Sequence, residues 1–299
     1  MTRFAAPRAR KGFTLAEILI AIAIGAIILL AAVSFLFTFI LNLEQTDEHT
    51  AAIQRAEMVM TILANPVLQS GTGIPSETAD FQESLAGLAT VSGWDGSVSV
   101  LTTNNLNDTL RIVYSVNTDS GLIGFSGDTV SDGDTADLTF DGTPGSGSFS
   151  TDNGDPKGWC VLPATGVPLK ITVINGAILT VTTAAASTKT ATFVRNDSLC
   201  SLRAMEAGVT SGTSPVFQTL DVGSGSGYQP RVQGISGIHF DLDADAGVLT
   251  VTVLARGSKR HDEAVTSSAP EGWNAAWGFS SEDTHYKFSV LQTSWRIRN

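Results

Sequence analysis

The hydrophobic and polar positions along the chain change character twice. Over residues 18–41 almost every residue is apolar, and only Ser34 and Thr38 are weakly polar interruptions. A helix over this run, rising about 1.5 Å per residue, is long enough to cross a hydrocarbon core of about 30 Å. The run therefore predicts a membrane-spanning helix.

After residue 41 the apolar positions take on the period of an amphipathic helix. The residues that fall near one face are Leu43, Ile53, Ala56, Met60 and Leu63. We expect a single helix over about residues 13–64, with its first half in the membrane and its second half packed on the domain that follows. Pro66 is predicted to end the helix, because proline cannot continue the helical hydrogen bonding.

Beyond Gly71, short alternating runs broken by Gly, Asn, Asp and Pro predict a β-rich domain over residues 66–299. The clearest hairpin covers residues 169–183, where Asn175 and Gly176 suit a type I′ turn. Further strands are expected at 110–116, 216–222, 235–241, 248–255 and 286–297, and loops at 126–155 and 223–227. The predicted fold class is α+β, a long N-terminal helix followed by a large β-rich globular head.

Charge is distributed unevenly around the apolar run. The basic residues before it and the acidic residues directly after it are Arg3, Arg8, Arg10 and Lys11, and Glu44, Asp47 and Glu48. Positive flanks stay in the cytoplasm, so we expect the N-terminus inside and the C-terminal bulk exported. The formal net charge is −11. A nucleic-acid binder needs a basic surface, and no such cluster follows residue 12 except the short step 259–261, so no direct nucleic-acid partner is expected.

The motifs of common enzymes are missing from the sequence. It contains no nucleophile elbow, HExxH, Walker loop or paired CxxC. The histidines, which are His49, His239, His261 and His285, lack metal-ligand spacing. We therefore expect a protein that is not an enzyme and needs no cofactor, with calcium as the one alternative.

The calcium alternative concerns Asp241, Asp243 and Asp245, which imitate the first ligands of a calcium loop. The imitation is incomplete, because Ala246 and Thr252 stand where such a loop needs glycine and a bidentate glutamate. An acidic hairpin turn is the preferred interpretation. A second acidic loop contains Asp128, Asp132, Asp134, Asp137 and Asp141.

The chain has two cysteines, Cys160 and Cys200, both in the part expected to be exported. In an oxidising compartment such a pair is expected to form a disulfide. Two buried free thiols are the alternative.

The junction before the apolar run, KGFTLAEILIAIAIG at residues 11–25, resembles the class III signal of type IV pilins and type II secretion pseudopilins. In that signal a short basic leader ends in glycine, here Gly12, and is followed by Phe13 and by Glu17 as the fifth mature residue. The resemblance implies that a prepilin peptidase cuts between Gly12 and Phe13 and methylates the new amino group of Phe13. It divides the chain into a leader (1–12), a transmembrane and assembly helix (13–65) and a head (66–299).

An ordinary secretory signal fits this junction poorly. Its apolar region is shorter, about 7 to 15 residues, and the small residues of its cleavage site follow that region. In this chain the apolar run is longer and the small pair Ala21 and Ala23 comes too early. An uncleaved signal anchor stays open.

Glu17 is a carboxylate at the start of an apolar span, where a deeply placed charge is costly and usually functional. The resemblance implies that its partner is the Phe13 amine of a neighbouring subunit, which would set the register of assembly. The alternative is a helix-start charge that reaches the membrane interface.

The C-terminal region is similar to PilW-type minor pilins, in a hairpin followed by a strand that ends the chain. The matching positions are Leu254, Arg256, Arg298 and Asn299. The resemblance implies a pilin-like fold and a minor subunit that primes type IV pilus assembly at the tip. The implied partners are prepilin peptidase, other minor pilins, the major pilin and the inner membrane, from which the subunit passes to the cell surface.

Two alternative functions stay open. A GspJ-like minor pseudopilin, at the tip of a type II secretion pseudopilus, shares much of this architecture. A signal-anchored surface adhesin or hydrolase is the other alternative.

Overall fold

The computed structural model describes residues 14–104, 106–144, 147–278 and 280–298. The chain separates into two compact units, one ending at Asp47 and one beginning at Glu48. The division falls inside the first helix. The predicted boundaries at residues 12 and 65 are not tested by it and stay predictions.

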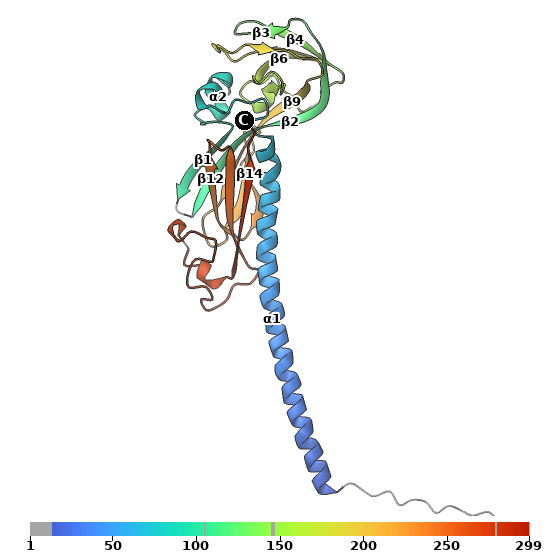
Figure 1. The fold of residues 1–299 in the computed structure, drawn as a ribbon, viewed down its shortest axis with the longest axis vertical. Helices are drawn as coiled ribbons and strands as arrows, with labels where there is room; N and C mark the ends of the chain where they lie inside the picture. Colours follow the sequence, from blue (N-terminus) through green and yellow to red (C-terminus); the bar gives the residue numbers. More distant parts are fainter. Residues whose placement is uncertain (1–13, 105, 145–146, 279, 299) are drawn as a thin grey trace, which may run out of the picture. The chain divides into compact units, whose positions relative to one another are not determined.

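The first helix, α1, covers Leu15–Gln69 and confirms the predicted long N-terminal helix (Figure 1). The prediction that Pro66 ends it is wrong, because Pro66 lies within its last turn. A proline there removes only one backbone hydrogen bond. The chain leaves the helix at Gly71, whose φ of 71° suits glycine. A Cβ at this position would fall on the carbonyl oxygen of Arg298, so the helix end and the segment that follows the strand Phe288–Arg296 approach too closely for any side chain.

Strands dominate the second unit, as predicted for the fold class. Among the described residues, twelve strands form one sheet. They are β1 (Val98–Asn104), β2 (Asn107–Phe125), β4 (Ala136–Phe140), β5 (Trp159–Val161), β6 (Leu169–Asn175), β7 (Ile178–Thr182), β9 (Ser198–Val209), β10 (Val216–Asp221), β11 (Gln229–Gln233), β12 (Ile235–Asp243), β13 (Val248–Arg256) and β14 (Phe288–Arg296). A second, small sheet pairs β3 (Thr129–Val130) with β8 (Ala191–Thr192).

The strand order is β11-β10-β9-β5-β6-β7-β4-β2-β12-β13-β14, with β1 beside β2 and with β9 also paired to β2. The pairs are antiparallel except β12 with β2, which meet in parallel only at Ile238 and Asn107. The helical segments after α1 are short: α2 (Thr78–Ser84) and the 3₁₀ turns Ala89–Val91, Pro156–Gly158, Ala275–Trp277 and Asp283–His285.

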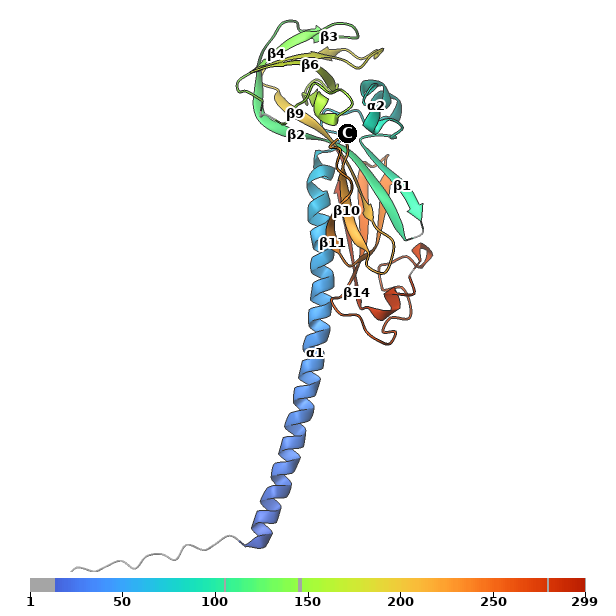
Figure 2. The ribbon, with the colours of Figure 1, turned by 180° about the vertical axis from the view of Figure 1, so that it is seen from behind.

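The main core of the second unit lies between α1 and the sheet. Ala52, Ala56, Val59 and Leu63 are completely buried and recur at the spacing of one helix face. Figures 1 and 2, which view the chain from opposite sides, show strands beside this part of α1 in both views. The same core includes buried residues of β1, β2, β9 to β13. Leu43 does not join the predicted stripe and is 47% exposed.

The hairpin predicted at residues 169–183 is present as β6 and β7, but its turn is shifted by one residue. Asn175 pairs directly with Ile178, so the two-residue loop consists of Gly176 and Ala177. In this loop only Gly176, at 60°, has a positive φ. The predicted type I′ turn is therefore wrong, and glycine at the first central position is the arrangement of type II′.

The loop predicted at 126–155 is also partly wrong, because it contains β3 and β4. In β4 the side chains of Ala136, Leu138 and Phe140 are buried, and the residues between them face the other side. This alternation is enough to hold a strand in the sheet. The segment 223–227 lies outside the strands, as predicted.

Candidate processing and assembly site

The start of α1 is fixed by a reciprocal cap. The backbone N–H of Thr14 donates to Oε2 of Glu17 at 2.9 Å, and the backbone N–H of Glu17 donates to the hydroxyl of Thr14 at 3.3 Å. The Thr14 hydroxyl also donates to the same carboxylate oxygen at 3.0 Å. This is a capping box, which satisfies helix N–H groups that have no partner within the helix. The T-x-x-E spacing in the sequence would have predicted it, and the sequence interpretation missed it.

The structure therefore gives Glu17 a partner within its own chain. Gly12 and Phe13, the predicted cleavage position and methylated residue, lie outside the described residues. The pairing of Glu17 with the Phe13 amine of a neighbouring subunit stays a prediction. In a filament, such an amine would have to compete with the Thr14 cap or share the carboxylate with it.

The apolar part of α1 is uncovered. Its large apolar side chains within residues 15–43 range from 40% exposed at Val33 to 79% exposed at Leu15. The helix is long and apolar enough to cross a membrane. Apolar surface in water costs about 25 cal/mol per Å², so lipid or other subunits must cover this segment.

The comparison with known families falls on this same region. Residues 7–33 match the family described as the prokaryotic N-terminal methylation motif. The chain carries a prokaryotic N-terminal methylation motif. No curated protein and no solved structure matches the chain.

The methylation motif indicates a protein like the type IV pilins or pseudopilins. It implies processing by a prepilin peptidase and assembly with other pilins. Together with the apolar helix, it also indicates anchoring in a membrane before assembly. The motif covers a small part of the chain, so the function of the head must be argued from its own residues.

The two cysteines do not form the expected disulfide. Cys160 pairs with Ser201 across β5 and β9, while Cys200 pairs with Val161, so the two cysteines are offset by one residue. Neighbours offset by one residue point to opposite faces of a sheet. The side chains indeed belong to two different hydrophobic clusters, and both thiols are free. Burial raises the pKa of Cys160 to about 12 and that of Cys200 to about 11.

The first calcium candidate forms the hairpin between β12 and β13. Asp241 and Asp243 lie at the end of β12, and Asp245 lies in the turn. Oδ1 of Asp243 accepts the backbone N–H of Ala246 at 2.9 Å, which stabilises the turn itself. Within the described residues no group of three acidic, histidine or cysteine side chains could hold a metal ion.

In the second acidic segment, Asp137 and Asp141 accept hydrogen bonds from residues of neighbouring strands. Asp137 accepts the hydroxyl of Thr180 at 2.7 Å, and Asp141 accepts the backbone N–H of Gly121 at 2.7 Å. The first bond joins β4 to β7, and the second joins the residue after β4 to β2. They give both carboxylates a structural role within the sheet.

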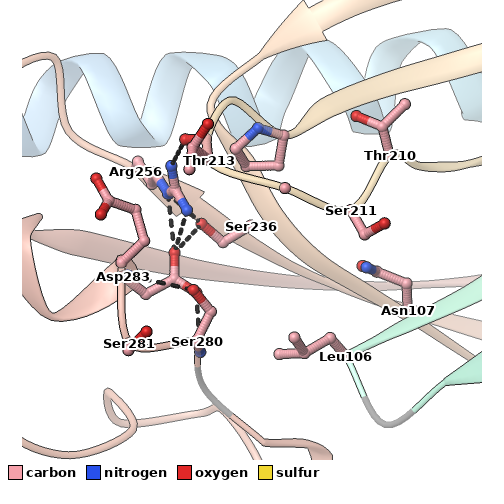
Figure 3. A pocket seen from close by; sticks show the side chains of 13 residues that line it. Leu106, Asn107, Thr210, Ser211, Thr213, Ser236, Arg256, Ser280, Ser281 and Asp283 are labelled. Carbon is pink, nitrogen blue, oxygen red and sulfur yellow. Dashed lines mark hydrogen bonds and ion pairs between the residues drawn. The ribbon is translucent and has the colours of Figure 1, made fainter.

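A buried ion pair that the sequence interpretation missed lies at the C-terminal end of β13. The guanidinium of Arg256 lies 2.7 Å from Oδ1 of Asp283, and both side chains are almost completely buried. Arg256 also donates to the Ser236 hydroxyl at 2.7 Å and to the carbonyl of Thr213 at 2.8 Å. Figure 3 shows Arg256 bonded to Thr213 on one side and to Ser236 and Asp283 on the other. These residues border a pocket of about 720 Å³. Because its donors are used in this way, Arg256 fastens the segment before β14 to the sheet.

A second buried carboxylate fastens the same segment to α1. Glu48 is 3% exposed, and its Oε2 lies 3.0 Å from Nε2 of His261 and 3.8 Å from Nζ of Lys287. About two turns further along α1, the guanidinium of Arg55 donates to the carbonyls of Arg256 and Gly257 at 2.8 Å each. These contacts join residues about 200 positions apart in the chain. Sequence spacing gives no signal for them.

Proposed function

We propose that the protein is a minor pilin of the PilW type, which primes assembly of a type IV pilus and lies at its tip. The observation that carries this proposal is the methylation motif at residues 7–33, followed directly by an apolar helix with uncovered side chains. A helix of this kind can be held by lipid before assembly and by other pilin helices afterwards. No chemistry is performed by the subunit itself.

In this proposal the prepilin peptidase cuts between Gly12 and Phe13 on the cytoplasmic face and methylates Phe13. The basic leader holds the junction at the membrane surface, and glycine allows close approach to the backbone. The head then lies outside the inner membrane. After assembly the subunit belongs to the pilus at the cell surface.

Glu17 is proposed to set the register of assembly by pairing with the Phe13 amine of a neighbouring subunit. A charge pair is favourable in a medium of low dielectric constant, where an unpaired carboxylate is costly. The Thr14 cap holds Glu17 in the first turn of α1 until that partner arrives.

The tip position is supported by the size of the second unit, which contains residues 48–299. A subunit can start a filament if its helix packs laterally while a large head blocks further stacking above it. Immunogold labelling of the pili should then mark fibre ends. Even labelling along the fibre would overturn the tip position.

Intact-mass analysis tests the processing step. The protein is expressed with and without its prepilin peptidase, and wild type is compared with Gly12→Ala. Loss of residues 1–12 with gain of one methyl group, dependent on both the peptidase and Gly12, is expected. An unprocessed N-terminus in the presence of the peptidase would leave a signal-anchored surface protein and remove the basis for filament assembly.

Deletion of the gene distinguishes a pilus from a secretion machine. Loss of pili with normal exoprotein secretion is expected. Loss of exoprotein secretion with intact pili would instead assign the subunit to a type II secretion pseudopilus.

A further inference from the structure

Two strands of the head, β1 and β12, line a groove of about 560 Å³ between them. Val98, Val100 and Thr102 line it from β1, and Leu242 lines it from β12. The rim is held by a hydrogen bond from the Thr78 hydroxyl to the carbonyl of Asp95 at 2.6 Å. The groove is thus an opening bordered by residues of two strands and by the segment that precedes β1.

The register of β1 directs half of its backbone groups into this groove. The N–H of Val113 donates to the carbonyl of Ser97 at 2.7 Å, and Val98 lies opposite Ile112. In an antiparallel pair, alternate residues bond to the partner strand. The residues at positions 98, 100 and 102 therefore direct their N–H and C=O groups away from β2. Within the described residues β1 has no second strand partner.

The facing edge of β12 shows the same alternation. The N–H of Ile238 donates to Oδ1 of Asn107, and the N–H of Phe240 donates to Oδ2 of Asp108, each at 3.1 Å. In the N-terminal part of β12, these side chains of β2 thus accept the N–H groups that a neighbouring strand would otherwise bind. The next residue of this alternation is Leu242, which lines the groove and has no such substitute among the described residues.

The side chains around the groove restrict what can enter it. Val98 is part of the main core, and Val100 and Leu242 pack against that core, so an inserted strand would place alternate side chains on apolar surface. The charged residues that line the groove are Glu77, Asp95 and Asp245, all acidic. A segment with alternating apolar residues and a basic residue near one end complements both features.

The edge of β11 provides a contrast. It contains Pro230, which cannot donate a ladder hydrogen bond, and neighbouring Arg231 adds a charge. Proline and charge are the usual means by which proteins protect an edge strand. Neither β1 nor β12 contains a proline.

We propose that this groove binds an extended segment of another exported polypeptide, which inserts as a strand between β1 and β12. The strand would run antiparallel to one neighbour and parallel to the other, because β1 and β12 run in opposite directions. Strand addition of this kind takes affinity from main-chain bonds and specificity from alternate side chains. The segment is proposed to come from another subunit of the same filament. This source is the one part of the proposal that rests on the proposed function.

The test uses fluorescein-labelled seven-residue peptides in which Val or Leu alternates with Thr. Each peptide carries a single Lys, placed at the N-terminal end in some peptides and at the C-terminal end in the others. Binding to the full-length protein in lipid nanodiscs is measured by fluorescence anisotropy. Each peptide has a control in which alternate backbone nitrogens are methylated. At least one parent peptide is expected to bind, and methylation is expected to abolish binding because it removes the ladder donors.

The matched variants are Thr102→Pro and Thr102→Val. Proline removes the N–H that faces the groove and leaves the bonds of β1 to β2 in place, whereas valine keeps the N–H. Thr102→Pro is expected to weaken binding about fivefold to tenfold, the effect of one hydrogen bond, and Thr102→Val is expected to bind like wild type. Far-UV circular dichroism checks that both variants fold.

Hydrogen exchange locates the bound peptide. Bound peptide should slow exchange of the amides of Val98, Val100 and Leu242, while amides of β11 should not change. The proposal is overturned if every peptide binds more weakly than about 1 mM, or if binding is the same for Thr102→Pro and Thr102→Val. These outcomes do not depend on processing at Gly12, so failure of the proposed function would be seen separately.

Discussion

The two units of the chain keep their apolar residues in opposite environments. Within residues 14–47, large apolar side chains are exposed, and Thr14, Thr38 and Thr46 form hydrogen bonds with groups only three or four residues away. Within residues 48–299, apolar side chains form buried clusters, and ion pairs join distant parts of the chain. The first unit depends on its surroundings for stability, while the second contains its own cooperative fold.

This difference separates the effects of substitutions. A change in the second unit should lower the free energy of unfolding of the head. A change in the first should leave the head intact and act on the helix start, the membrane or neighbouring subunits.

Removal of one partner of the buried ion pair should have the largest effect. Asp283→Ala leaves the guanidinium of Arg256 buried without its counter-charge, which costs about 3–5 kcal/mol. Urea unfolding of the full-length protein in detergent, followed by tryptophan fluorescence, measures the loss. The double variant Arg256→Met with Asp283→Leu removes both charges and should recover most of the stability. A loss below about 1 kcal/mol for Asp283→Ala would show that the pair does not stabilise the head.

The same substitution in the two halves of α1 tests whether the two units differ in how their apolar residues contribute to stability. Leu63 is completely buried, whereas Leu29 is 65% exposed. Leu63→Ala should lower the free energy of unfolding of the second unit by about 2–5 kcal/mol, because it leaves a cavity. Leu29→Ala should leave head unfolding unchanged in the same assay. Equal losses for the two variants would contradict the division at residue 47.

Elements with a strong pattern could be predicted from the sequence. The apolar run, the hairpin of β6 and β7, and the strands β10, β12, β13 and β14 follow alternation or length alone. By contrast, β9 was missed, because its Ala, Met, Glu and Gly residues have low strand propensity and its position is decided by pairing with β2, β5 and β10. The tertiary pairing outweighs the local preference there.

The second half of β2 was missed for another reason. Residues 117–121 have the composition of a turn, but the strand continues through them with a register irregularity, in which Asp119 takes a φ of 57°. Such a bulge inserts extra residues without ending the strand. Pairing with β9 on both sides of the irregularity decides the outcome.

At the candidate site, one local contact could have been predicted from the sequence, and the long-range contacts could not. The cap of Thr14 on Glu17 follows a local spacing and could have been predicted. The pairs of Arg256 with Asp283 and of Glu48 with His261 could not, because the tertiary fold brings together a helix, a strand and a loop that are far apart in the chain. The disulfide prediction failed because sequence gives no register, and a shift of one residue turns a side chain to the other face.

The buried thiols give a pH-dependent effect of intermediate size. The pKa of Cys160 is raised to about 12 and that of Cys200 to about 11, whereas an unfolded thiol ionises near 8.5. As the pH rises above about 8.5, the unfolded state releases protons first, so stability falls between there and the folded pKa values. Urea unfolding at increasing pH should show this loss, and the variant Cys160→Ala with Cys200→Ala should show less of it.

The same thiols should be unreactive in the folded protein. A thiol reagent added at pH 8 should label none of the native protein and two groups per chain in denaturant, because the reactive species is the thiolate. Rapid labelling of the native protein would contradict the burial. An oxidised mass, two hydrogens lighter than the reduced chain, would instead establish a disulfide and contradict the opposite-face arrangement.

The smallest effect on stability is expected at the helix start. Thr14→Ala removes the hydroxyl that caps Glu17 and should cost about 1 kcal/mol, confined to the first turn of α1. Hydrogen exchange should become faster at Glu17 and Ile18 only, while Thr14→Ser, which keeps the hydroxyl, should behave like wild type. Urea unfolding of the head should not change in either variant. The cap and a neighbouring subunit's amine would share one carboxylate, so incorporation of the Thr14→Ala subunit into pili is a second measurement. Normal incorporation would show that the cap is dispensable for the register of assembly. Lost incorporation with a stable head would show that the cap must first hold Glu17 in place.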